Sequence, residues 1–160
     1  MALSLTHLIQ KQMEFVANNN SWHASLIELL ESVTPEEAVW RPEGGGHTIY
    51  ELAVHLAYSV EEATSRLQGN TPQWIEEQSW VQSPQPLTAD EWESAKARVV
   101  QSRQKLAETV ADMGDSRLEA PREGNKPPFM ELVLQIIHHD AFHAGQIALL
   151  RRQQGKAALM

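Results

Sequence analysis

The stretch "LQIIHHDAFHAGQIALLRR" (residues 134–152) holds three of the chain's seven histidines inside a run that has the spacing of a core helix. At about 100° per residue, His139 and His143 lie one turn apart and share a stripe with aliphatic side chains and Gln146. His138 points away from that stripe by roughly a quarter turn. The pattern predicts a buried helix with two histidines on its core face.

Two buried imidazoles need partners, because burying a polar group without a hydrogen bond costs free energy. A divalent metal ion is one such partner, since neutral imidazole binds zinc, nickel, copper and iron, and histidines at i and i+4 can chelate one ion. A third ligand has to come from another helix, and His55 in "YELAVHLAYS" (50–59) is the candidate. Two other interpretations stay open: core histidines that are hydrogen-bonded without metal, and a chance pair on a solvated face.

Helical periodicity continues through the rest of the chain, and no strand pattern is convincing. Capping boxes, formed by Thr48 with Glu51 and by Thr88 with Glu91, mark the starts of two helices. Four long helices are predicted over about residues 4–32, 48–68, 88–113 and 129–154, with a short helix that begins at residue 34. We therefore expect an all-α protein, a four-helix bundle with long inter-helix loops that forms one domain over residues 1–160.

Three irregular segments separate the predicted helices, at residues 41–47, 69–86 and 114–128. The second carries Trp74 and Trp80, which either wall a substrate pocket or cover an exposed end of the bundle. Loops of this length in a compact domain are more often functional than idle.

Composition excludes several classes of protein and site. The formal net charge of −8 disfavours binding to nucleic acid, because an acidic protein repels phosphate. The absence of cysteine excludes a disulfide frame, a thiolate metal site and a thiol nucleophile within the chain. The start "MALSLTHLIQKQMEF" lacks the features of a secretory signal, and no apolar run approaches the roughly 20 residues of a membrane helix. We therefore expect a cytoplasmic protein without a membrane partner.

Several residues near the predicted histidine site have two interpretations. Asn20 and His23 interrupt the apolar stripe of the first helix, where they either line a pocket beside the metal or mark a solvated bend. Gln146 either fixes a ligand ring or a bound water, or satisfies a buried backbone group. Trp22 is expected to pack in the protein interior, the commoner use of tryptophan.

Three further residues receive structural assignments. Glu51 lies one turn before His55, but it also completes a capping box, and we assign it to the cap. Asp140 lies about 100° from the ligand stripe, where a solvated position is favoured over a contact with a ligand. Gly145 lies in mid-helix, where it is expected to allow close helix packing.

Three segments resemble the DinB/YfiT-like superfamily, and together they span nearly the whole chain. They are "NNNSWHASLIELLESVTPEEAVWRP" (18–42), "RPEGGGHTIYELAVHL" (41–56) and "HHDAFHAGQIALLRR" (138–152). The last is similar to the family's closing H-x-x-x-H-x-G-Q-I motif. The two histidine motifs are fairly specific together and weak singly. One position departs from the pattern: family members often carry arginine where this chain has Ala144, so anion or partner contacts made by that arginine would be missing.

The resemblance implies a four-helix bundle that holds a divalent metal, most often zinc or nickel, through His55, His139 and His143. It also implies homodimers and, for some members, thiol-dependent transferase or isomerase reactions with low-molecular-weight thiols. It identifies no catalytic residue.

Three hypotheses of function follow. The first is a metal-dependent enzyme, a thiol-dependent transferase or a hydrolase, that acts on a small molecule through three histidines. The second is a non-catalytic metal-binding protein of the stress response. The third is a bundle for dimerisation or partner binding, in which the histidines are structural.

Overall fold

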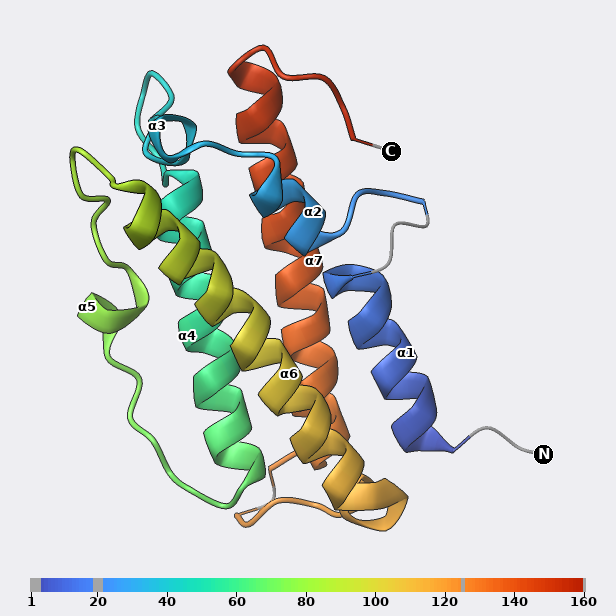
Figure 1. The fold of residues 1–160 in the computed structure, drawn as a ribbon. Coiled ribbons are helices and arrows are strands. Elements are labelled where there is room, and N and C mark those ends of the chain that lie inside the picture. Colours follow the sequence, from blue (N-terminus) through green and yellow to red (C-terminus); the bar gives the residue numbers. More distant parts are fainter. Residues whose placement is uncertain (1–3, 19–21, 125, 160) are drawn as a thin grey trace.

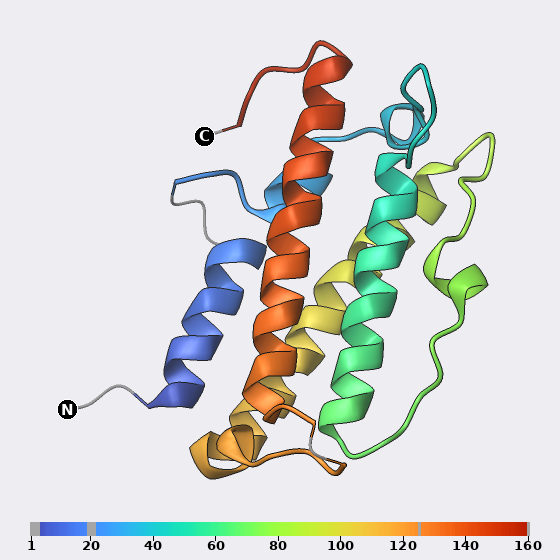
Figure 2. The ribbon, with the colours of Figure 1, turned by 180° about the vertical axis from the view of Figure 1, so that it is seen from behind.

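The chain folds as a bundle of helices in the computed structural model, which describes residues 4–18, 22–124 and 126–159. The long helices run alongside one another (Figures 1 and 2) and are α1 (Leu5–Ala17), α4 (Ile49–Leu67), α6 (Ala89–Glu119) and α7 (Phe129–Gln153). The short helices are α2 (Leu26–Glu31), α3 (Pro35–Ala38) and α5 (Glu76–Ser79). The described residues form no strand, which confirms the all-α prediction.

The prediction of one continuous helix over residues 4–32 is wrong. This stretch is divided into α1 and α2, which follow one another along α7 and together occupy one position of the bundle (Figure 2). Asn18 ends α1, and the side chain of Ser25 begins α2 by accepting from the backbone N–H of Glu28. Asn18 suits such a helix end, since asparagine hydrogen-bonds readily to backbone in non-helical conformations.

Gly114 interrupts α6 at the point where the third helix was predicted to end. Its φ of 67° lies in the left-handed region that glycine adopts without strain, and a further helical turn follows it. The side chain of Asp115 in that turn accepts hydrogen bonds from the backbone N–H groups of Leu5 and Thr6, at 3.1 and 2.8 Å. The predicted irregular segment 114–128 is therefore helical in its first part, where it fixes the start of α1.

The core consists of two apolar clusters, one towards each end of the bundle. The first contains Leu52 and Leu56 of α4 with Ile147 of α7. The second contains Val60 of α4 and Ile136 of α7. On α7, His139 and His143 lie between Ile136 of the second cluster and Ile147 of the first, whereas on α4 His55 lies between Leu52 and Leu56 of the first cluster.

The long loop between α4 and α6 runs along the outside of α4 and carries α5 (Figure 1). This segment matters for the site because it brings Ser79 and Trp80 against the middle of α4.

Two packing predictions are wrong. The side chain of Trp22 is 98% exposed and contributes nothing to the core. A Cβ atom added at Gly145 would meet no other atom within 4 Å, so no helix packs closely there.

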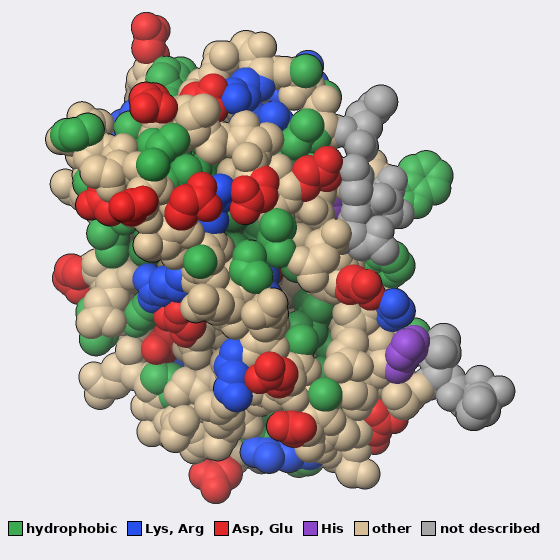
Figure 3. All heavy atoms as spheres, viewed as in Figure 1, with side chains coloured by type: hydrophobic (Ala, Val, Ile, Leu, Met, Phe, Trp, Pro, Cys, Tyr) green, Lys and Arg blue, Asp and Glu red, His purple; other side chains and the backbone are tan. Residues whose placement is uncertain are grey.

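No basic patch stands out on the face of the described residues that Figure 3 shows. Acidic and basic side chains are interspersed on that face. Among the described residues, none of the helices combines the length and the apolar composition that crossing a bilayer requires.

Candidate metal centre

The start of α4 places His55 on the inner side of that helix. The side chain of Thr48 accepts from the backbone N–H of Glu51, and the Glu51 carboxylate accepts from the backbone N–H of Thr48, which confirms the capping box. His55 follows one turn after Glu51 and is only 6% exposed. Arg41 and Ser83 also donate to the carboxylate of Glu51, so this group is committed to structure.

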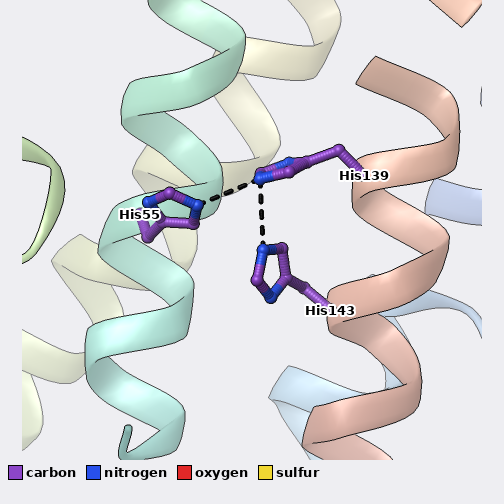
Figure 4. A group of neighbouring side chains, drawn as sticks. All are labelled: His55, His139 and His143. Carbon is purple, nitrogen blue, oxygen red and sulfur yellow. Dashed lines mark hydrogen bonds between the residues drawn. The ribbon is translucent and has the colours of Figure 1, made fainter. Parts of the chain in front are cut away.

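The middle of α7 brings His139 and His143 to face His55 (Figure 4). The Nε2 atom of His139 lies 3.0 Å from Nε2 of His55 and 3.1 Å from Nε2 of His143. All three residues offer a nitrogen within 4.8 Å of the others. His138 is exposed and takes no part in this cluster, as predicted.

The spacing of these nitrogens fits a small divalent ion. Zinc binds imidazole nitrogen at about 2.0–2.1 Å, and two nitrogens in a tetrahedral shell are then roughly 3.3 Å apart. The two measured separations, 3.0 and 3.1 Å, fall slightly below this value. These two separations are therefore close to those of a zinc shell, and the third pair, His55 with His143, has its ligand atoms within 4.8 Å.

Two of the three rings have a hydrogen-bond partner at the nitrogen that faces away from the cluster. Nδ1 of His143 donates to Oε1 of Gln146 at 2.6 Å, which leaves a lone pair on its Nε2. Nδ1 of His55 lies 2.7 Å from Oγ of Ser79. Such outer partners are usual for metal-binding histidines, because they fix the tautomer and the ring orientation. Nδ1 of His139 is buried and has no partner among the described residues.

The cluster holds its imidazoles neutral. Burial, followed by the neighbouring histidines, lowers the pKa of His55 to about 3. Burial and His143 lower the pKa of His139 to about 4, and burial also lowers the pKa of His143. Neutral imidazole is the form that binds metal, so the rings need lose no proton to act as ligands at neutral pH.

Aromatic side chains form a wall beside the cluster. The ring of Trp80 stacks on His55 and on His47, with centroids 3.8 Å apart in both pairs. Trp74 meets His55 edge-on at 6.0 Å, and Phe142 lies 5.1 Å from His143. Both loop tryptophans therefore contact a candidate ligand, and whether they wall a substrate pocket stays a prediction.

Comparison with known protein families identifies a match. The family model described as "DinB superfamily" matches residues 20–147.

The chain belongs to the DinB superfamily.

A crystal structure of a DinB-like protein from Bacillus cereus shares the superfamily fold with this chain. Its TM-score is 0.70 at 16% sequence identity, and the match covers 100% of this chain and 99% of that one. No curated protein matches the chain.

The other predicted site residues of this DinB-superfamily chain have different outcomes. Gln146 contacts the His143 ring, the first of its two interpretations. His23 is exposed, and its Nδ1 contacts the backbone oxygen of Ala24 rather than any histidine of the cluster. Asn20 lies outside the described residues.

The prediction that Asp140 is solvated is wrong. Asp140 is 5% exposed and receives two hydrogen bonds from Arg103, at 2.9 and 2.7 Å. The helical wheel placed Asp140 correctly off the ligand stripe, but it could not show that Arg103 of α6 occupies that side of α7. Sequence reasoning also missed Ser79, because a short loop helix has no periodicity that would orient its side chains.

Proposed function

We propose that this DinB-superfamily chain is a metal-dependent enzyme, a thiol-dependent transferase or a hydrolase, that acts on a small molecule. His55, His139 and His143 would hold the ion. The observation that carries the proposal is the convergence of three nitrogens, with separations of 3.0 and 3.1 Å, from rings whose pKa values are lowered. Three inward-facing imidazoles have too few N–H groups to satisfy one another without leaving a buried nitrogen unpaired.

The chain's own residues would supply positioning and shielding. Ser79 and Gln146 hold two of the rings, and Trp80 covers one face of His55 against water. His139 is less buried than the other two histidines, so we expect a substrate to approach from its side. The bound ion would supply positive charge that three neutral ligands leave uncompensated, which acidifies a water molecule or a thiol.

Zinc and nickel are the ions that we expect, since nitrogen ligands suit both and the chain has no thiolate. The test is elemental analysis of protein purified without an affinity tag, followed by anomalous scattering from crystals. One equivalent of ion at the three histidines is the expected result. Protein that remains free of metal after incubation with zinc and with nickel would contradict the proposal.

Turnover is tested with metal-loaded protein, low-molecular-weight thiols and small electrophiles, and with small ester and amide substrates for hydrolysis. We expect activity that chelation removes and that the same ion restores. A variant with His139 replaced by alanine should be inactive under the same conditions.

A second candidate function is a non-catalytic metal-binding protein of the stress response. One observation favours it: the two buried carboxylates nearest to the ligands in sequence, Glu51 and Asp140, are both engaged by arginine and other donors. Neither is free to act as a general base. Stoichiometric metal without turnover in any of these assays would favour this function.

We also propose that the protein is a homodimer. Exposed apolar side chains along α7 support this, since Phe142 is 64% and Leu149 is 59% exposed. Light scattering during size-exclusion chromatography should give twice the mass of the 18.0 kDa chain. A monomer mass at micromolar concentration would contradict the proposal.

A further inference from the structure

The segment from Ile75 to residue 83, called the strap below, lies along α4 in the opposite chain direction. Its first backbone N–H, at Ile75, donates to the side-chain oxygen of Tyr58 at 3.0 Å. Its last residue, Ser83, donates from its backbone N–H to Glu51 at 3.2 Å. Between these two anchors, Ser79 meets His55 at 2.7 Å. The strap therefore contacts α4 at successive turns, and the middle contact involves a candidate metal ligand.

The middle contact differs from the other two in burial and in its chemical consequence. Ser79 has no exposed surface, and His55 is 6% exposed, so water cannot replace the hydroxyl group easily. The next residue, Trp80, stacks on the His55 ring at an interplanar angle of 6°. The strap thus fixes both the rotation of the ring and its plane.

We propose that Ser79 is a positioning residue that directs Nε2 of His55 towards the metal. In the loaded site, Nδ1–H of His55 donates to Oγ of Ser79, which leaves the lone pair on Nε2 directed at His139. This inference rests on the proposed metal site and adds that the strap belongs to it. His143 receives the equivalent support within α7 from Gln146, so the two supports differ in origin: one is local and the other comes from 24 residues away.

The test is the zinc affinity of three proteins, measured by competition with a chromophoric chelator: wild type, Ser79→Ala and Ser83→Ala. Ser83 is the matched control, because it anchors the same strap through its hydroxyl group to Thr48 and Glu51 but touches no histidine. We expect Ser79→Ala to bind zinc about 10–100-fold more weakly and Ser83→Ala to stay within about twofold of wild type. Equal zinc affinity of wild type and Ser79→Ala, or equal losses of affinity in both variants, would overturn the positioning role of Ser79. Neither result would contradict the proposed metal site. Wild-type protein that binds neither zinc nor nickel would overturn the proposed metal site and this inference with it.

A second measurement uses the wild type and does not depend on the folding of a variant. Proton NMR of the zinc-loaded protein should show the Nδ1–H of His55 as a downfield signal that exchanges slowly with water. Assignment of that proton to Nε2 would overturn the proposal, because a protonated Nε2 has no lone pair for the ion.

Discussion

Two polar groups that face the bundle interior, Asp140 and His139, are neighbours on α7 and differ in where they find their partners. Asp140 pairs with Arg103, and the remaining terminal nitrogen of that guanidinium donates to the backbone oxygen of Val99, so the chain itself satisfies this pair. His139, the preceding residue, faces two other neutral rings. The two groups thus differ in the completeness of their hydrogen bonding: Asp140 is fully paired within the chain, whereas Nδ1 of His139 has no partner among the described residues.

The largest expected effect on stability comes from breaking the ion pair between Arg103 and Asp140. Replacing Arg103 by methionine leaves Asp140 buried without its partner, and such losses cost about 3–5 kcal/mol of stability. Urea denaturation of the metal-free protein, followed by circular dichroism, measures the change. The double variant Arg103→Met with Asp140→Leu should recover most of the loss, because no unpaired charge remains. A double variant as unstable as the single one would show that the pair matters through its shape and not its charge.

The second largest effect is expected at His139, whose hydrogen bonding is incomplete. Replacing His139 by alanine should abolish the stabilisation that zinc gives to the wild type, about 2.7 kcal/mol at a hundred times the dissociation constant. The matched control is His138→Ala, because that neighbouring imidazole is exposed and lies off the cluster. Melting temperatures with zinc and with chelator measure both variants. The same zinc-dependent shift in wild type and His139→Ala would exclude this residue as a ligand.

The comparison also shows what the sequence could and could not predict. Helical periodicity and capping boxes were sufficient for the all-α bundle, because both depend on residues close together in the chain. The i and i+4 spacing of His139 and His143 is equally local. Its position between apolar neighbours made His55 the candidate third ligand, and the family resemblance implied the same residue.

Two other contacts, one across the bundle and one from an irregular segment, were beyond sequence reasoning. Asp140 finds Arg103 37 residues away, and Ser79 reaches His55 from a loop without periodicity. The break between α1 and α2 was missed because the apolar stripe resumes after it, and a pocket and a solvated bend were both left open for Asn20 and His23. Side-chain partners across the bundle depend on how the helices are rotated against one another, and the pattern along a single helix does not fix that rotation.

A third effect is the pH dependence of the metal-free protein. The folded-state pKa values of His55 and His139, about 3 and about 4, lie below the ordinary value of 6.5. The unfolded chain therefore binds more protons as the pH falls below 6.5, and stability should decrease from there towards the folded pKa values. The decrease should be about 1–2 kcal/mol between pH 6.5 and 5.5, discounted because His139 is partly exposed. Urea denaturation at both pH values measures it. His138→Ala should keep this dependence and His139→Ala should weaken it, and equal slopes in the two variants would contradict the assignment.

The smallest effect tests whether the partner of a ligand ring matters as much as the ring. Replacing Gln146 by leucine removes the oxygen that accepts from Nδ1 of His143. The ring can then rotate and adopt the other tautomer, so zinc affinity should fall about tenfold, or about 1.4 kcal/mol. Gln135→Leu is the matched control, because it makes the same substitution at an exposed position of α7. If both variants bind zinc as the wild type does, the packing of α7 alone orients His143. The hydrogen bond to Gln146 would then not be needed for the ring to bind the ion.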